Sequence, residues 1–266
     1  MLPRTIQNRG MNNNLFCRKN INLLKELTIS NFKLRNEGSI LGILWYLINP
    51  LLMLTVLYVV FSKSVGSSIE HYAFYVLIGV IQWNFFSAST TDAMYSIESY
   101  SIMIRKVPFR KELLILGVVT NIFLSHLIEW VLMLTLIIII LGISNAFILL
   151  PIIILMQLML SITISLTLGI IITYYRDIKN IWRNIIFIAW FLTPIFYLKS
   201  AIPKSFSFIN SINPMTWIIS FTRTILIDKA FPTLSETIII FVSLAILLII
   251  CLIIFRKFSI NMAERI

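Results

Sequence analysis

Six mainly apolar stretches, each close to the length of a membrane-spanning helix, constrain this chain more than any other feature. A helix needs about 20 such residues to cross the hydrocarbon core of a bilayer. Apolar residues make up 59% of the chain and charged residues 12%, and a soluble fold of this size could not bury that much apolar surface. The sequence therefore predicts an all-α polytopic membrane protein with no separate soluble domain. The six expected transmembrane helices are residues 41–62, 73–91, 113–142, 147–174, 184–198 and 237–255.

The basic residues predict how these spans are oriented. Of the 22 Lys and Arg residues, 17 fall before the first span, after the second, after the fourth and after the sixth, and five fall on the opposite side. Cytoplasmic loops carry the excess of Lys and Arg, so both termini are expected in the cytoplasm. The net charge of +11 is then explained by the orientation of the spans in the membrane. No nucleic-acid partner is expected. A cleavable signal peptide is not expected either, because Arg4 and Arg9 are not followed by an apolar core and a cleavage site.

Two segments outside the spans have amphipathic or broken patterns. Residues 15–35 are too polar to span, but their leucines recur near one face at helical spacing, which predicts an amphipathic helix on the inner membrane surface. A merely polar tail is the alternative. Residues 199–236 contain prolines that interrupt regular helix, and the apolar run after Pro214 is short for a span. We expect short re-entrant helices on the outer side there, with a true extra span as the alternative.

The motifs of nucleotide, disulfide and metal chemistry are missing from the sequence. None of the eight glycines is followed by lysine, so the chain lacks the Gly-Lys loop whose backbone N–H groups wrap the phosphates of ATP. Cys17 and Cys251 lie far apart and do not form a disulfide framework, and two histidines are too few for a metal site. We expect no cofactor or metal on this chain.

His126 and Glu129 are the polar pair inside the third span. Residues at i and i+3 share a helix face, and a carboxylate in lipid costs roughly 2.5 kcal/mol or more, so Glu129 must face protein or water. A proton relay is one interpretation. A structural pair, or a residue that lines a wet interior, is the other. The pattern favours the second, because a proton-coupled carrier usually needs more than one such site.

Aromatic residues gather near the ends of the first and fifth spans. They can form the interfacial belts of an ordinary membrane protein, or some of them can line a path and stack on sugar rings. The sequence does not separate these interpretations. The candidates for a channel or gate are Trp45, Tyr46, Tyr58, Phe61, Phe191, Phe196 and Tyr197.

Four stretches, in order along nearly the whole chain, carry a family resemblance. They are residues 24–50, which include Leu41-Gly-Ile-Leu-Trp-Tyr-Leu-Ile-Asn-Pro50; Ile104-Arg-Lys-Val107 with Phe109-Arg-Lys-Glu-Leu113; Tyr175-Arg-Asp-Ile178; and Leu192-Thr-Pro-Ile-Phe-Tyr197 with Ile202-Pro203, Asn213-Pro214 and Arg223. Together they resemble the membrane subunit of bacterial ABC transporters that export O-antigen, capsule or teichoic acid chains. In this sequence Pro108 precedes Phe109, where the family pattern has the aromatic residue before the proline.

The resemblance implies an assembly and a mechanism. The chain would form a homodimer in the bacterial cytoplasmic membrane with two copies of a separate subunit that binds ATP and Mg²⁺. Residues 95–112 would sit in a groove of that subunit and pass its motion to the spans. The two membrane chains would enclose a channel for a lipid-linked glycan, O-antigen-like, with capsule or teichoic acid as alternatives.

The resemblance also gives roles to particular residues. Arg176 and Asp177 would lie at the inner interface, either paired across it or as a local pair, and Arg223 would lie at the outer gate. A proton-driven secondary carrier that uses Glu129 and a membrane-embedded enzyme of glycan metabolism are the competing functions. The residues expected to couple the chain to the ATPase are Arg105, Lys106, Phe109, Arg110 and Glu112. The alternative is that the charged ones are only the basic loop charges that mark the cytoplasmic side.

Overall fold

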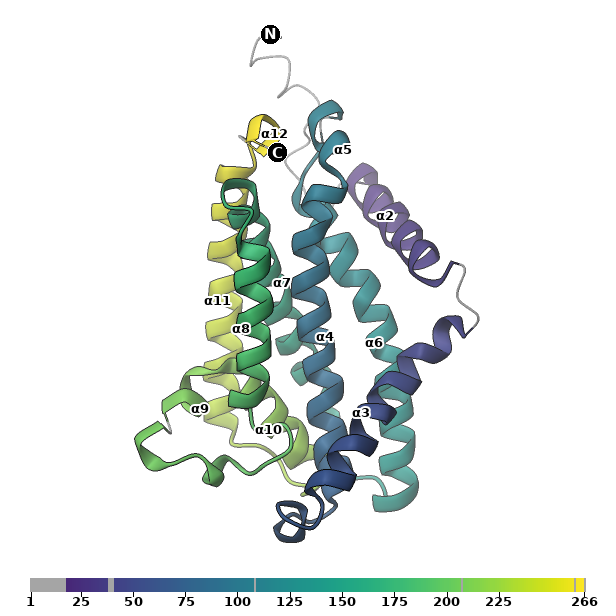
Figure 1. Ribbon diagram of the computed structural model, residues 1–266, viewed down its shortest axis with the longest axis vertical. Helices are drawn as coiled ribbons and strands as arrows, with labels where there is room; N and C mark the ends of the chain where they lie inside the picture. The colour runs from purple at the N-terminus through teal and green to yellow at the C-terminus, as the bar shows by residue number, and fades with distance from the viewer. Residues whose placement is uncertain (1–17, 38–40, 108, 207, 261, 266) are drawn as a thin grey trace.

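Every regular element that the computed structural model describes is a helix (Figure 1), which confirms the predicted all-α class. Arg4, Arg9, Cys17 and Pro108, together with the start of the expected interface helix, lie outside the described residues. The described ranges are 18–37, 41–107, 109–206, 208–260 and 262–265.

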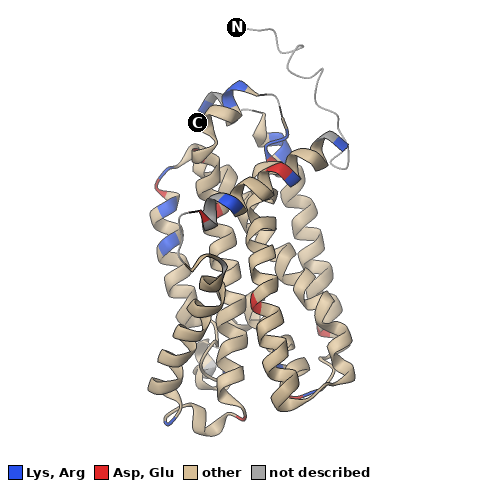
Figure 2. Ribbon diagram, turned by 90° about the vertical axis from the view of Figure 1, so that its right-hand side faces the viewer, with Lys and Arg blue, Asp and Glu red and all other residues tan. Residues whose placement is uncertain are grey.

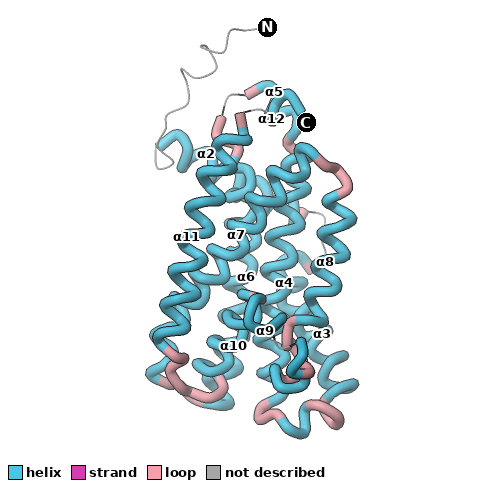
Figure 3. The backbone as a smooth tube through the Cα atoms, turned by 90° about the vertical axis from the view of Figure 1, so that its left-hand side faces the viewer, coloured by secondary structure: helices cyan, strands magenta, loops and turns pink. Residues whose placement is uncertain are grey.

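Among the described residues, six helices run along the length of the molecule (Figures 1 and 3). The second of them, α4, packs against four others, α3, α6, α7 and α8, while α11 packs against α7. The bounds are α3 Trp45–Phe61, α4 Tyr72–Ser99, α6 Glu112–Leu141, α7 Leu150–Tyr174, α8 Ile178–Leu192 and α11 Leu234–Ser259.

Three segments of the described chain are long and apolar enough to cross a membrane. They are Glu112–Leu141, Asn145–Tyr174 and Leu234–Ser259, and α3 is a shorter apolar helix. These helices expose large apolar side chains along much of their length, which lipid or another apolar partner has to cover. The protein is therefore an integral membrane protein.

Further helices close the two ends of the bundle. We call the end with α2, α5 and α12 the basic end, because Lys and Arg gather there (Figure 2). We call the end with η4, η5, α9 and α10 the cap end. The bounds of the remaining elements are α2 Arg18–Asn36, η1 Gly42–Leu44, η2 Gly66–Ser68, α5 Ser101–Lys106, η3 Asn145–Leu149, η4 Lys199–Ala201, η5 Lys204–Phe206, α9 Phe208–Ile212, α10 Pro214–Leu226 and α12 Met262–Arg265.

Close contacts between helices depend on small residues. Apolar side chains gain little by moving from lipid into protein, so tight packing and polar contacts hold membrane helices together. A Cβ on Gly169 of α7 would collide with the side chain of Ile115 in α6. A Cβ on Gly117 of α6 would lie 3.1 Å from the Cβ of Leu27 in α2. These two glycines therefore set how closely α6 approaches its neighbours.

The amphipathic helix expected at residues 15–35 is present as α2, which packs against α6. Leu27 is buried in that contact, while Lys25 and Lys33 are exposed. The amide Nδ2 of Asn121 in α6 donates to the carbonyl of Thr28 at 3.2 Å. The apolar face of α2 thus packs partly on protein, and its position on the inner membrane surface stays a prediction.

The fifth expected span, residues 184–198, differs from the helix in that region. α8 begins earlier, at Ile178, and ends at Leu192. Proline disfavours helical backbone in the residue before it, and Thr193, which precedes Pro194, has an extended backbone with φ −88° and ψ 130°. The expected helix was therefore wrong over 193–198, where the chain crosses the cap end without regular structure.

After this break the chain returns toward the bundle as α10. Asn213 caps the helix, because its side-chain oxygen accepts from the backbone N–H of Met215 at 3.0 Å. Pro214 follows at the first helical position, where its missing N–H has no intrahelical partner to lose. α10 buries Ile218 and Ile219 against the core near α4 and α7. The two short helices α9 and α10 occupy the segment for which re-entrant helices were predicted.

Candidate functional site

The segment between α4 and α6, residues 95–112, forms a bent surface element at the basic end. α4 ends at Ser99 and α5 follows at once, packed against α12. Ile104 is only 2% exposed and belongs to the same buried cluster as Met262 of α12. Arg105 and Lys106, at the end of α5, are exposed. The buried isoleucine therefore anchors α5 and leaves this basic pair free to contact another molecule.

Arg110 and Glu112 point into the protein. Nη2 of Arg110 lies 2.6 Å from Oε1 of Glu112, and both side chains are buried. Nε of Arg256, near the end of α11, lies 3.5 Å from the same carboxylate oxygen, and the ammonium of Lys111 donates to the carbonyl of Ser259. These contacts join the start of α6 to the end of α11. Phe109 is partly buried against the neighbouring apolar cluster.

A second ion pair at the basic end joins α4 to α8. The ammonium of Lys179 contacts the carboxylate of Glu98 and lies 5.7 Å from the ring centroid of Tyr95. Arg176 and Asp177, the pair expected at the inner interface, lie just before α8 and are exposed. Sequence reasoning missed the Lys179–Glu98 pair, since 81 residues separate its members.

At the cap end, the irregular segment after α8 is held by side chains from two other helices. Four successive carbonyls, from Pro194 to Tyr197, accept hydrogen bonds. The hydroxyl of Tyr72 donates to Phe196 O at 3.0 Å, and that of Tyr75 to Tyr197 O at 2.9 Å. Non-helical backbone in a membrane protein needs such internal partners, because lipid offers none. Both tyrosines were absent from the predicted gate residues.

Arg223 of α10 supplies the remaining contacts of this segment. Its Nη1 donates to Pro194 O at 2.7 Å and its Nη2 to Ile195 O at 2.6 Å. Nε and Nη2 also donate to the carbonyl of Tyr75, at 3.1 and 2.9 Å, and the guanidinium carbon lies 3.3 Å from the Tyr75 ring centroid. A Cβ on Gly79 would lie 3.0 Å from Nη2. Arg223 thus joins α10, α4 and residues 194–195 at a place where a side chain on Gly79 would crowd it.

The predicted channel aromatics do not form one group. Trp45 and Tyr58 are exposed, Tyr46 is buried, and Phe61 stacks on Phe196 with ring centroids 4.9 Å apart. The hydroxyl of Tyr197 donates to the carbonyl of Phe191 at 2.6 Å.

Phe191 also lines a pocket of about 490 Å³ between α3, α4 and α8. Trp83, Trp190 and Arg183 line the same pocket and were not among the gate candidates. The rings of Trp83 and Trp190 meet edge to face, with centroids 5.9 Å apart. Their places in the sequence gave no signal, since the two tryptophans come from helices far apart along the chain. The pocket combines apolar rings with one cation.

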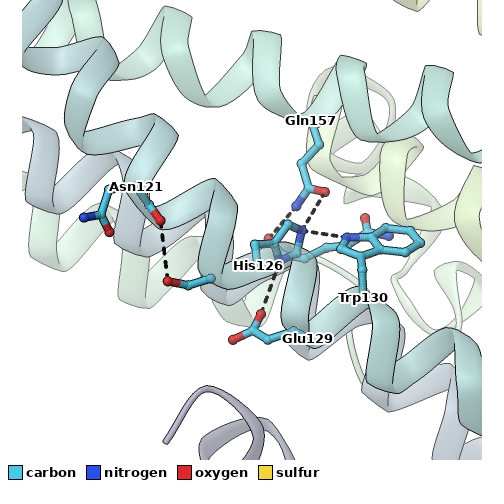
Figure 4. A network of polar contacts seen from close by, with 7 residues as sticks. Asn121, His126, Glu129, Trp130 and Gln157 are labelled. Carbon is cyan, nitrogen blue, oxygen red and sulfur yellow. Dashed lines mark hydrogen bonds and ion pairs between the residues drawn. The ribbon is translucent and has the colours of Figure 1, made fainter. Parts of the chain in front are cut away.

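His126 and Glu129 of α6 contact each other, as their spacing predicts (Figure 4). Nδ1 of His126 lies 3.2 Å from Oε2 of Glu129, and the indole N–H of Trp130 donates to His126 Nε2 at 2.7 Å. An indole nitrogen can only donate, so Nε2 accepts and the ring proton lies on Nδ1, directed at Glu129. Nε2 of His126 lies 3.4 Å from Oε1 of Gln157. Both atoms are then acceptors, so they form no hydrogen bond in this tautomer.

Gln157, which lies beside His126, belongs to a chain of hydrogen bonds that crosses the core. Gln157 of α7 donates from Nε2 to the carbonyl of Gln82 in α4 at 2.9 Å, and Nε2 of Gln82 donates to Thr222 of α10 at 2.6 Å. These side chains are buried. A buried network whose members are held this way orients helices. It ties α7, α4 and α10 together.

Glu129 also reaches a polar pocket of about 450 Å³ on the other side of His126. Trp45 and Tyr46 of α3, Asp92 of α4 and His126 share its lining. Glu129 keeps 13% of its side-chain surface exposed, in agreement with a carboxylate that faces a wet interior. Within the described residues, no group of three or more His, Cys, Asp or Glu side chains is placed to hold a metal ion.

A known protein family and several relatives match most of this chain. The sequence pattern of the ABC-2 type transporter family matches residues 22–227, from α2 through α10. The O-antigen export system permease protein RfbA of Klebsiella pneumoniae is 26% identical over 247 residues, which are 91% of this chain and 94% of that protein. A protein of the same name from Myxococcus xanthus is 27% identical over 218 residues, 79% of this chain and 82% of its own length.

Proposed function

Because the chain belongs to the ABC-2 type transporter family, we propose that it is the channel-forming membrane subunit of an exporter for a lipid-linked polysaccharide, powered by a separate ATP-binding subunit. The observation that carries this proposal is the similarity to O-antigen export permeases over most of the chain. A chain without a Gly-Lys phosphate loop also needs another subunit to bind ATP and Mg²⁺. An O-antigen-like glycan is the proposed substrate, ahead of capsule or teichoic acid.

In the proposed topology, α3, α4, α6, α7, α8 and α11 cross the bacterial inner membrane with both termini in the cytoplasm. The basic end is then the cytoplasmic end, as the excess of Lys and Arg there favours, and the cap end faces outward. Three of these helices are long and apolar enough by themselves. The irregular segment after α8 fits this topology, because protein side chains supply the hydrogen bonds that lipid cannot.

A homodimer is the proposed membrane unit. α8 has no buried residue in the single chain, and Phe187, Ile188 and Phe191 are among its exposed apolar side chains. Two copies that face each other across α3 and α8 would bring their two 490 Å³ pockets together. Aromatic rings there can stack on the apolar faces of sugars, and this would form the path of the glycan.

The lever in this proposal is α4. At an axial rise of 1.5 Å per residue, its 28 residues span about 42 Å. Near one end Glu98 contacts Lys179 of α8, and at the other Tyr72 and Tyr75 hold the segment that follows α8. Force applied to Arg105 and Lys106 by the ATPase would therefore move α4 and α8 as one body. This motion would shift residues 193–198, the irregular segment after α8.

The proton-driven carrier is the alternative that Glu129 raises, and the geometry weighs against it. A second proton on His126 Nε2 would meet the indole N–H of Trp130 at 2.7 Å, so the ring is placed to hold one proton and not to pass protons along. We expect Glu129→Gln to keep export at the wild-type level, because the amide oxygen still accepts from Nδ1. Export measured by surface-glycan blots checks this, and loss of export with normal insertion would favour the relay.

The substrate assignment is tested by deleting the gene in its own host. We expect the O-antigen-like surface glycan to disappear from the cell surface and its lipid-linked precursor to accumulate inside. Plasmid-borne wild-type chain should restore both, as the control. Loss of capsule or teichoic acid, with the other glycan intact, would correct the substrate and keep the exporter. Unchanged surface glycans would contradict the proposed function.

A further inference from the structure

A pocket at the cap end brings two cations together. It has a volume of about 350 Å³ and lies between η4 and α10. Lys199 and Arg223 line it, with the hydroxyl residues Ser200 and Ser220 and the exposed carboxylate of Asp228. Arg183 and Phe191, which line the proposed glycan path, are not part of its lining.

Neither cation has a carboxylate partner among the described residues. The ion pairs within 4.0 Å in that part of the chain involve other side chains. The partners of Arg223 are three neutral carbonyls and one aromatic ring, although the residue is only 7% exposed. The ammonium of Lys199 lies 4.7 Å from the ring centroid of Trp217. A buried cation without an anion is costly, and an anionic ligand in this pocket would lower that cost.

The pKa shifts of Lys199 and Asp228 describe the charges around this pocket. Burial, and next the positive charge of Arg223, lower the pKa of Lys199, so the two cations repel each other, and the more distant carboxylate of Glu236 offsets this only in part. Burial and the charge of Glu70 raise the pKa of Asp228. A carboxylate that served as the counterion of two cations would have a lowered pKa. Asp228 lines the pocket but does not show the lowered pKa of a paired counterion.

The donors left in the pocket fit a phosphate group. Nη1 of Arg223 donates to one carbonyl, Pro194 O, and the guanidinium also contacts the side chain of Tyr75, so Arg223 contributes mainly its positive charge. The Lys199 ammonium provides up to three donors. Arg and Lys bind phosphate oxygens through charge-assisted hydrogen bonds, and hydroxyls such as that of Ser200 add neutral ones. A sugar alone would not need two cations.

We propose that this pocket binds the phosphate group of a membrane lipid at the cap end. The lipid is either the diphosphate carrier of the exported glycan or an anionic phospholipid. The assignment of the phosphate to the glycan carrier rests on the proposed function. The presence of an anion site in this pocket does not. In the carrier case, the pocket holds the diphosphate as it reaches the outer leaflet. In the phospholipid case, it anchors the cap end at the headgroup level.

The test uses the full-length chain in nanodiscs of phosphatidylcholine, with bound lipid measured by native mass spectrometry. The added probes are an isoprenyl diphosphate, phosphatidylglycerol or inorganic pyrophosphate. We expect Lys199→Gln to weaken binding of the lipid probe about tenfold, the effect of one lost charge-assisted hydrogen bond. Lys199→Arg should retain binding. The matched control, Lys63→Gln, removes an exposed cation outside the pocket and should bind like wild type.

The probes separate the two sources. Tighter binding of the isoprenyl diphosphate than of phosphatidylglycerol would assign the site to the carrier, and equal binding would assign it to phospholipid headgroups. Binding of pyrophosphate alone would overturn the lipid assignment. Failure to bind any probe, or equal binding by Lys199→Gln and wild type, would overturn the site. No ATPase or export takes part, so these failures leave the deletion test of the proposed function unaffected.

Discussion

Replacement of Arg223 by methionine is expected to lower the free energy of unfolding by about 3 kcal/mol and to abolish export. The change removes the donors to Pro194 O and Ile195 O, and each buried carbonyl left without a partner costs about 1–3 kcal/mol. Release of the buried charge offsets part of that loss. Residues 194–195 would then lose their attachment to α10, and α10 would lose its hydrogen bonds to the carbonyl of Tyr75 in α4.

Two further variants show whether geometry or charge is responsible. Arg223→Lys keeps the charge but concentrates its donors on one nitrogen, which cannot reach all three carbonyls as the guanidinium fork does. We expect its stability to fall between those of wild type and Arg223→Met, measured by denaturant unfolding in detergent. Lys63→Met serves as the control for loss of an exposed cation. A lysine variant as stable and active as wild type would contradict the role of the fork.

Charge reversal of Arg105 and Lys106 to glutamate is expected to stop export almost completely while the chain still inserts and folds. Both side chains are exposed and α5 stays anchored through buried Ile104, so the fold has little to lose. An acidic pair would repel the groove that the basic pair is proposed to enter, since complementary charges set partner choice. ATP hydrolysis by the partner should continue without export.

The matched control for this pair is Lys257→Glu, which reverses an exposed charge at the same end on α11. Export by this variant should stay near wild type. Membrane insertion is measured by fractionation, ATPase activity in purified membranes and export by a surface-glycan blot. Normal export by the double variant would show that α5 is not the element that receives the motion of the ATPase.

Apolar stretches predicted most helix positions, because a spanning helix leaves a long uninterrupted signal. The third stretch, 113–142, became Glu112–Leu141, and the fourth, 147–174, ends where α7 ends. The fifth expected span, 184–198, was wrong at its end because the sequence stays apolar beyond Pro194. That proline ends the helix, and the following residues stay apolar because they face protein.

The site was predicted less completely than the fold. His126 and Glu129 were found together because one helix turn joins them. The tautomer of His126 depends on Trp130, and the nearby hydrogen bonds of Gln157 and Gln82 join other helices; the sequence predicted neither. Arg110 and Glu112 were expected at a partner surface and instead form a buried pair with each other. A local pattern reveals which residues share a helix face, and contacts between distant helices require the packed structure.

The central claim is that this chain forms a path and a lever that a separate ATPase drives. The most direct measurement is purification of the tagged chain from its native membranes in mild detergent, with identification and counting of the proteins that come with it. We predict a stoichiometric partner that carries a Gly-Lys phosphate loop, at one copy per membrane chain, and ATPase activity in the preparation. A chain that reconstitutes into vesicles without such a partner and still moves the lipid-linked glycan would contradict the account.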